Sequence, residues 1–449
     1  MNYISKAAQP GSVCRLDVNF IDYDGTLLYS YTASEFANLS ALPGNPSHEG
    51  LIAQGWNWSL ADAKTYVASY GKLWIGQMYI TESGDTEIDV ELQAPRLSPY
   101  LGIAVNGAVE VDWGDGTAKS TVTGTDTDLT TQIMTPHVYA TDGSYTIKIH
   151  VVSGSFSLCG SAWNSVLSGN FSSNSNTVYS NIVQRVRVGS SMPSIYQAFS
   201  SCYSLTSITI PSGVTSISGS AFSSCCSLTS ITIPSGVTSI SGSAFSNCSS
   251  LASITIPSGV TSIGIDVFYY CFSLALIPIP SGVTSIRDRI FGYCYSLTSI
   301  TIPNGVTSIG NSAFDHCGSL ASITIPSGVT SISNSAFYYC RGLGLIRFEP
   351  TTPPTVAHSN AWTNIPTDCI ILIPYNSVSY IGATNYPSSS TYSYVGYMAS
   401  VSGETLPTQT TSANYTLTWY ATKEEAASGI GTQLTQGNGN EIYCRYTTS

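Results

Sequence analysis

The clearest potential for chemistry lies in seven cysteines that recur at a fixed spacing of 23 residues. They are Cys202, Cys225, Cys248, Cys271, Cys294, Cys317 and Cys340. Equivalent residues that stack like neighbouring strands, about 4.8 Å apart, have parallel side chains, whereas a disulfide needs converging Cβ atoms about 3.5–4.5 Å apart. The sequence supplies no histidine at the same spacing for a metal site. We therefore expect buried thiols that pack as small hydrophobic groups, with Cys226 exposed beside them.

Two pairs of aspartates are a second candidate for chemistry. Asp22 and Asp24 follow an apolar run in the order D-x-D-G-T, and Asp85 and Asp89 lie in the order G-D-x-x-x-D. Both motifs resemble those of haloacid-dehalogenase-like phosphatases, which implies a nucleophile, an acid/base and a metal-binding pair. Only about 60 residues separate the motifs, too few for the crossovers of a doubly wound sheet. The D-G-T order also recurs at Asp115, so we expect β-turns here rather than a phosphatase site.

The remaining polar residues form no other catalytic pattern. The chain has five histidines and contains neither H-E-x-x-H nor G-x-S-x-G. His48 and His137 are interpreted as structural, and the many serines belong to a repeat. The sequence therefore predicts a protein that is not an enzyme and that uses no cofactor or metal.

Composition narrows the class of partner. Of the 449 residues only 9% are charged, against about 25% in ordinary soluble domains. The net charge of −11 argues against nucleic acid or anionic lipid as a partner, and the longest apolar run is too short to span a membrane. The 29 tyrosines are typical of binding proteins. The start of the chain resembles no secretory signal, so we expect folding in a cytoplasm or an already processed product.

The elements that position the cysteines form a 23-residue repeat with the consensus C-x-x-L-x-x-I-x-I-P-x-G-V-x-x-I-x-x-x-x-F-x-x. Ile208 and Ile210 alternate with Ser207 and Thr209, which predicts a short strand with one apolar and one polar face. Pro211 ends the strand because it cannot donate to a ladder. One unit cannot bury its apolar face alone, so the units are expected to stack as a solenoid.

This unit resembles the BspA-like class of leucine-rich repeats, found in surface and secreted proteins of bacteria and some protists. The resemblance covers about residues 182–387 and implies adhesion or ligand binding. Residues 186–199 resemble a degenerate first unit, and the segment from Cys369 to Pro374 resembles the closing unit of the family.

Three further modules are expected around the repeat. The order F-x-D-x-D-G from Phe20, P-x-x-P-x-x-E-G from Pro43 and G-W at Gly55 resembles a Listeria–Bacteroides β-grasp module, which we assign to residues 1–95. Residues 59–70 are expected to form a helix with Ser59 as its N-cap. Residues 96–154 resemble a PKD-type immunoglobulin-like sandwich because V-E-V-D-W-G-D-G is followed by H-V-Y and G-S-Y-T-I-K-I. The solenoid with its caps then occupies 155–387. Residues 388–449 are interpreted as a linker and a small β module with a hairpin at Asn438-Gly439.

Positions beside each cysteine vary widely between units, whereas the strand threonines form a uniform outward ladder. The variable positions include many aromatic residues and are expected to face solvent along one edge. They predict a contact strip for a glycan or protein, with tyrosines stacking on sugar rings or packing on a partner. The alternative is neutral variation, with tyrosine covering the rim. The candidate residues are Tyr203, Tyr269, Tyr270, Phe272, Tyr293, Tyr295, Asp315, His316, Tyr338 and Tyr339.

The sequence thus predicts a mostly β, modular binding protein with a leucine-rich-repeat solenoid. We expect a phage tail or virion-surface protein that contacts a host-cell glycan or protein, with other virion proteins as further partners and a homo-oligomer as a possible assembly. A bacterial cell-surface adhesin and a structural spacer are the alternatives.

Overall fold

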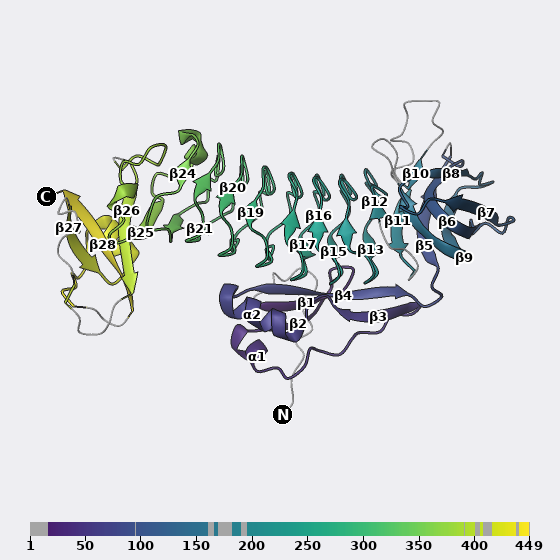
Figure 1. Cartoon of the computed structure of the whole chain (residues 1–449), viewed down its shortest axis with the longest axis horizontal. Coiled ribbons are helices and arrows are strands. Elements are labelled where there is room, and N and C mark those ends of the chain that lie inside the picture. The colour runs from purple at the N-terminus through teal and green to yellow at the C-terminus, as the bar shows by residue number, and fades with distance from the viewer. Residues whose placement is uncertain are drawn as a thin grey trace. The chain divides into compact units, whose positions relative to one another are not determined.

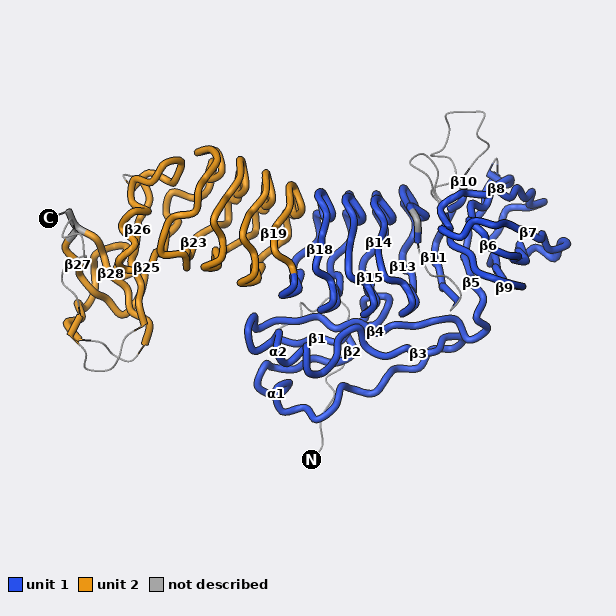
Figure 2. Tube along the Cα trace, in the orientation of Figure 1, with its two compact units in different colours: residues 1–282 blue, residues 283–449 orange. Residues whose placement is uncertain are grey.

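The computed structural model describes residues 17–94, 96–159, 166–168, 182–189, 195–389, 391–399, 405–406, 415–436 and 440–448. The chain divides into two compact units, residues 1–282 and 283–449 (Figure 2). Strands make up most of the regular structure, which confirms the predicted mostly β fold. Within the described ranges, no helix is long and apolar enough to cross a membrane.

The first unit begins with a four-stranded sheet, in the order β2-β1-β4-β3, on which two helices pack. Its elements are β1 (Val18–Ile21), β2 (Leu27–Tyr31), α1 (Ala33–Ala37), β3 (Leu51–Trp56), α2 (Leu60–Tyr70) and β4 (Leu73–Thr81). Phe20 of β1 and Phe36 of α1 meet in the core between sheet and helices. Ser59 caps α2 by accepting a hydrogen bond from the Asp62 amide, which confirms the predicted helix start.

A second group of strands follows, dominated by two long antiparallel strands, β6 and β9. Its elements are β5 (Thr86–Leu92), β6 (Tyr100–Asp112), β7 (Ser120–Thr125), β8 (Ile133–Pro136), β9 (Gly143–Cys159) and β10 (Leu167–Ser168). Val109 and Val111 of β6 and Ile147 and Ile149 of β9 are fully buried, in the alternating pattern that the sequence predicts.

The solenoid turns of the first unit add two parallel ladders, as Figure 1 shows. Their strands are β11 (Val183–Arg187), β12 (Ile195–Tyr196), β13 (Ser207–Thr209), β14 (Ser216–Ile217), β15 (Ser230–Thr232), β16 (Ser239–Ile240), β17 (Ser253–Thr255) and β18 (Ser262–Ile263). Strand β5 pairs with β11, and β9 pairs with β12. The sheet of β5–β9 therefore continues both ladders and covers the open end of the solenoid.

The interior of each turn contains one phenylalanine and one cysteine beside its leucine, isoleucine and valine side chains. Phe222, Phe245 and Phe268 stack face to face, with centroids 5.3 and 5.8 Å apart. The Cys248 thiol donates a hydrogen bond to the Phe222 carbonyl, 26 residues earlier, at 3.0 Å. The same bond to the phenylalanine carbonyl 26 residues earlier is formed by Cys225, Cys271, Cys317 and Cys340. All seven repeat cysteines are buried free thiols, as predicted. From the sequence we predicted only that these thiols pack as small hydrophobic groups, and the hydrogen bond to the phenylalanine carbonyl was not predicted.

The polar face of the strands is covered in the first unit, which corrects the expectation of an outward threonine ladder. Thr209, Thr232 and Thr255 are buried. The N-terminal module reaches three equivalent carbonyls that precede a proline: Asn57 donates to Ile233, Trp58 to Ile256 and Tyr66 to Ile279. A Cβ on Gly76 of β4 would collide with the side chains of Thr232 and Thr255, so this close approach requires glycine. In the second unit, Thr301 and Thr324 are exposed.

The second unit holds the remaining turns and the C-terminal strands. Its elements are β19 (Ser285–Ile286), β20 (Ser308–Ile309), β21 (Ser322–Ile325), β22 (Ser331–Ile332), β23 (Leu345–Phe348), β24 (Thr355–Val356), η2 (Ser359–Trp362), β25 (Ile370–Pro374), η3 (Val378–Tyr380), β26 (Ser393–Ala399), β27 (Tyr415–Tyr420), α3 (Lys423–Ser428) and β28 (Glu441–Thr448). Phe291, Phe314 and Phe337 stack as in the first unit, and Trp362 ends the stack 5.1 Å from Phe337.

The C-terminal strands extend the solenoid ladder. β25 pairs with β23 in parallel, as expected for a closing unit, but β26 then adds to β25 in parallel and β28 adds to β26. Arg347 of β23 forms a bidentate ion pair with Glu441 of β28 at 2.6–2.7 Å. The predicted hairpin at Asn438-Gly439 lies outside the described residues.

Candidate functional site

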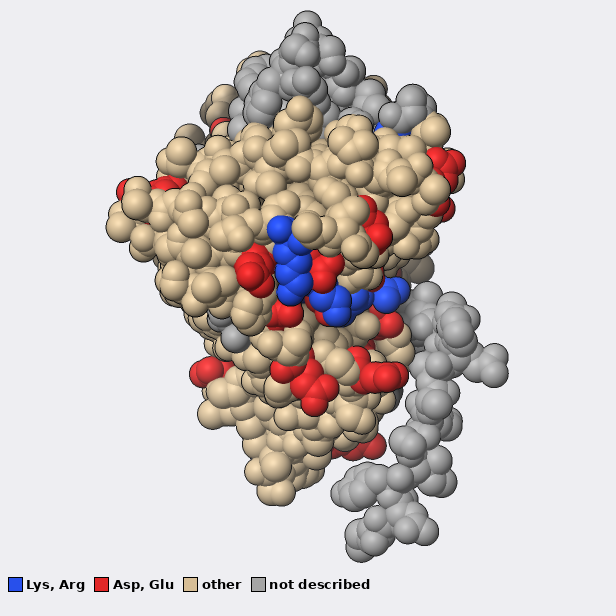
Figure 3. Space-filling view, turned by 90° about the vertical axis from the view of Figure 1, so that its right-hand side faces the viewer, with Lys and Arg blue, Asp and Glu red and all other residues tan. Residues whose placement is uncertain are grey.

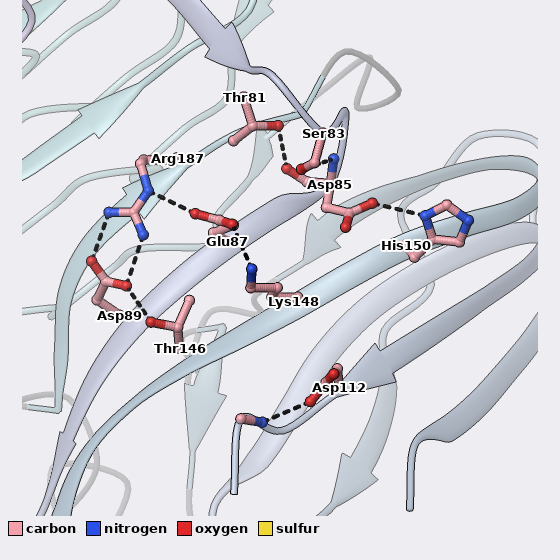
Figure 4. Close-up of polar contacts among 11 residues, drawn as sticks. Thr81, Ser83, Asp85, Glu87, Asp89, Asp112, Thr146, Lys148, His150 and Arg187 are labelled. Atoms are coloured by element: carbon pink, nitrogen blue, oxygen red, sulfur yellow. Dashed lines mark hydrogen bonds and ion pairs between the residues drawn. The ribbon is translucent and has the colours of Figure 1, made fainter. Parts of the chain in front are cut away.

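The aspartates of the phosphatase-like motifs lie on two different sheets and have structural partners. Asp22 follows β1 and contacts Nε2 of His48 at 2.6 Å, while Asp24 accepts from the Thr26 amide in a turn. Asp85 directly precedes β5 and pairs with His150, and Asp89 lies within β5 (Figure 4). This arrangement agrees with the expected turns at Asp22 and Asp24.

Asp89 belongs to an ion-pair network that ties β5 to β11 and β9 (Figure 4). Arg187 forms two hydrogen bonds to Asp89, at 2.7 and 2.9 Å, and one to Glu87, which also pairs with Lys148. Burial acts to raise the pKa of Asp89, but the hydrogen bonds from Arg187 and Thr146 outweigh it and lower the pKa. The face drawn in Figure 3 likewise shows the few Lys and Arg side chains beside Asp and Glu, on a mostly uncharged surface.

The thiols have little potential for reaction. Burial raises the pKa of Cys248 and Cys317 well above that of a free thiol, and it raises the pKa of Cys159 to about 11. Cys226 is half-buried rather than exposed, because its thiol lies 3.5 Å from the Asn247 carbonyl of the next turn. The seven repeat cysteines are therefore part of the solenoid core.

The residues directly before each cysteine, here called the pre-cysteine row, share an unusual backbone conformation. Their φ angles lie between +57° and +64°, the left-handed region that asparagine and glycine tolerate best. The row consists of Ser201, Ser224, Asn247, Tyr270, Tyr293, His316 and Tyr339. Four of the seven positions thus hold a bulky ring at a conformation that costs about 1–3 kcal/mol for an ordinary side chain.

In the second unit the pre-cysteine row forms a continuous ring stack. Tyr293 and His316 are parallel with centroids 4.4 Å apart, and His316 and Tyr339 are parallel at 4.7 Å. Backbone hydrogen bonds hold the turns in register, since the Tyr293 amide donates to Asp315 and the His316 amide donates to Tyr338. Asp315 also contacts Nδ1 of His316 at 2.5 Å. Burial raises the pKa of Asp315, although the hydrogen bond from His316 opposes this effect.

The residues directly after each cysteine, the post-cysteine row, flank this stack. Tyr295 stands perpendicular to Tyr293 and is 45% exposed. Gly318 occupies the same position in the next turn, and Arg341 in the turn after that. The Arg341 guanidinium lies 4.8 Å from the centre of the Tyr339 ring. We call this group of residues the aromatic strip of the second unit; it consists of Tyr293, Tyr295, His316, Gly318, Tyr339 and Arg341.

The first unit carries a smaller aromatic group. Tyr269 and Tyr270 are in contact at 4.2 Å, and Phe272 stands perpendicular to Tyr270 with 37% of its surface exposed. Tyr203 lies three turns earlier and is half-buried.

The structure thus brings the predicted residues together in two groups. In the second unit these are Tyr293, Tyr295, Asp315, His316, Tyr338 and Tyr339, and in the first they are Tyr269, Tyr270 and Phe272. Arg341 and Gly318 were not among the predicted site residues. Their variation beside the cysteine was visible in the sequence, but apart from the Asp315-His316 pair only aromatic residues were chosen.

Comparisons with known proteins address the repeat. The family model for the BspA type Leucine rich repeat region matches six copies, at residues 172–298, 220–344 and 262–392. A leucine-rich repeat protein of T. pallidum is 27% identical, over 47% of this chain and 85% of that chain, with a TM-score of 0.31. A leucine rich cell surface protein from Faecalibacterium prausnitzii is 28% identical, over 40% and 70%, with a TM-score of 0.24. No curated protein matches the chain. The β-grasp and PKD resemblances of the N-terminal modules stay predictions.

Proposed function

Because the chain carries a BspA-type leucine-rich-repeat region, we propose that it is a non-enzymatic binding or adhesion protein whose contact surface includes the aromatic strip of the second unit. The observation that carries this proposal is the stack of Tyr293, His316 and Tyr339 on left-handed backbone. Other turns use serine or asparagine at this position, so the fold itself does not require a ring there.

A ring at these positions opposes the local backbone preference. Asn247 can adopt the left-handed conformation at lower cost than tyrosine. Stacking recovers part of the cost, since aromatic pairs contribute about 0.5–1.5 kcal/mol. The strip also leaves Tyr295 largely exposed, which core packing does not explain. Strained residues that gather with exposed aromatic side chains are typical of functional surfaces.

The partner we propose is a cell-surface glycan or protein. We place the protein on a virion surface, as a phage tail or related component, and the alternative location is a bacterial cell surface. The proposed contact surface is the same for both locations. Neighbouring genes distinguish them: tail or capsid genes support the virion, and sortase or secretion genes support the bacterial surface.

The N-terminal modules have a supporting role in this proposal. The module that we assign to residues 1–95 covers solenoid carbonyls through Asn57, Trp58 and Tyr66. Strand β9 begins in the module assigned to residues 96–154 and continues to Cys159, and its last residues, Leu158 and Cys159, pair with the solenoid strand β12. Because these modules are engaged with the first unit, we assign ligand contact to the solenoid rim.

A binding screen against glycan arrays and intact bacterial cells tests the proposal. The test variant combines Tyr293→Ser and Tyr339→Ser, because serine already occupies this position in other turns. The matched control combines Thr301→Ala and Thr324→Ala, two exposed and equivalent repeat positions of the same unit, of which Thr324 lies on β21. We expect the test variant to bind at least tenfold more weakly, about 1.4 kcal/mol, and the control to bind like wild type. Equal binding by all three proteins would contradict the site, and no binding by wild type would favour a structural spacer.

A further inference from the structure

The post-cysteine row of the second unit contains a notch at Gly318. The equivalent positions in the preceding and following turns carry Tyr295 and Arg341, both exposed. A Cβ added to Gly318 would meet no atom within 4 Å, so the space above it is open. The neighbouring Gly342 packs closely on Gly318, because a Cβ there would lie 2.6 Å from the Gly318 carbonyl, so backbone lines this side of the notch. Two turns separate Tyr295 from Arg341, roughly 9.6 Å by strand spacing, which leaves room for one ring-sized group.

The two walls of the notch have different chemistry. Tyr295 stands perpendicular to the ring stack and presents an exposed aromatic ring, a surface on which a sugar ring can pack. Arg341 rests on the Tyr339 ring, which holds its planar guanidinium in place. Arg341 forms no ion pair with any residue that the structure describes. A guanidinium held over a ring in this way can donate two parallel hydrogen bonds to one carboxylate.

The surrounding charges favour one anionic group over a polyanion. Asp315, the only acidic residue beside the cysteines of these three turns, is paired with His316 at 2.5 Å. The chain as a whole carries a net charge of −11, which repels long polyanions. A glycan with one acidic sugar among neutral ones avoids that repulsion and still supplies a partner for Arg341.

We propose that the notch at Gly318 binds a single carboxylate-bearing sugar residue, with its ring on Tyr295 and its carboxylate on Arg341. This inference rests on the proposed function and names the ligand class for the same surface. Arg341 sets the preference for acid, and Gly318 sets the size of the group that enters.

Calorimetric titration of the full chain with three probes tests the notch. The probes are lactose, lactose carrying one N-acetylneuraminic acid, and lactose carrying one glucuronic acid. We expect wild type to bind at least one acidic probe tenfold or more tightly than lactose. Arg341→Gln should lower the affinity for that acidic probe to the affinity for lactose. Arg341→Lys should retain only part of the preference for the acidic probe, because lysine lacks the planar pair of donors of arginine. Gly318→Gln should abolish binding while the melting temperature stays unchanged, since its side chain enters open space.

Three results would overturn the inference: equal affinity for lactose and both acidic probes, an acid preference that survives in Arg341→Gln, or a short poly-glutamate peptide that competes as well as the acidic sugar. The proposed function fails differently, because its readout is cell or array binding that depends on Tyr293 and Tyr339. If cell or array binding depends on Tyr293 and Tyr339 but the protein shows no preference for acidic sugars, only the proposal for the notch is contradicted.

Discussion

The imidazole of His316 lies parallel to the phenol ring of Tyr293, with their centroids 4.4 Å apart and their planes 8° from parallel. Tyr339 covers the other face of the imidazole at 4.7 Å. The middle ring of the stack therefore offers a ligand its edge and not its face. Tyr295, which stands perpendicular to the stack, is the ring with an accessible surface. This refines the sequence-based expectation that the tyrosines as a group would stack on sugar rings.

The first prediction concerns the phenylalanine stack. Phe245 is fully buried between Phe222 and Phe268. We expect Phe245→Ala to lower the free energy of unfolding by about 3–5 kcal/mol, because the neighbouring turns cannot close the cavity. Urea denaturation measures this loss. A loss below about 1 kcal/mol would show that the stack does not hold the core together.

The second prediction concerns the thiols. Burial raises the pKa of Cys225 and Cys248 well above that of a free thiol, so both should resist alkylation in the native protein. We expect iodoacetamide followed by peptide mapping to modify Cys226, the half-buried cysteine, before Cys225 or Cys248. Reductant should leave the melting temperature unchanged. A clear drop in reductant would instead indicate disulfides and an oxidising compartment.

The third prediction tests how the N-terminal module is held on the solenoid. The indole N–H of Trp58 donates to the Ile256 carbonyl, whereas that of Trp74 is buried without a partner. Trp58→Phe should destabilise by about 1–3 kcal/mol more than Trp74→Phe, because only the first leaves a buried carbonyl unpaired. Both changes replace an indole by a phenyl ring, so the difference in unfolding free energy reports the lost hydrogen bond together with the deeper burial of Trp58. Equal losses would mean that this bond does not stabilise the interface.

The fourth prediction concerns acid stability. Burial acts to raise the pKa of Asp115, but hydrogen bonds from Thr117 and His137 outweigh it and hold the pKa at about 2. The folded state therefore favours the ionised carboxylate relative to the unfolded chain, whose aspartates titrate near about 3.9. This contribution is present above about pH 4 and is lost as the pH falls toward about 2. The advantage of wild type over Asp115→Asn in melting temperature should shrink across this range, and a constant difference would contradict the assignment.

The repeat could be predicted from the sequence because its pattern is local. The spacing of Ile208, Ile210 and Phe222 defines the buried side of each turn, and stacking follows from it. What covers the polar side could not be predicted in this way. Asn57 and Ile233 are 176 residues apart, and nothing within the repeat distinguishes the covered Thr232 from the exposed Thr324.

The rings of the candidate site were visible in the sequence, whereas Arg341, Gly318 and the geometry of the strip were not predicted from it. Ser224, Asn247 and Tyr293 share one left-handed position, so the residue types gave no clear signal of that conformation. The ring stack depends on that conformation, and so does the position of Arg341 over Tyr339. Aromatic content pointed to the strip, whereas the notch at Gly318 is visible only when consecutive turns are placed in register.

The central claim is that the rings of the pre-cysteine row serve binding and not folding, and Tyr293→Asn tests it most directly. Asparagine already occupies this position at Asn247 and tolerates the left-handed backbone better than tyrosine. The measurement is a cell-binding titration of this variant beside wild type, with thermal unfolding of both proteins. We predict a melting temperature no lower than that of wild type and at least tenfold weaker binding. Unchanged binding in the folded variant, or a large loss of stability, would contradict the account.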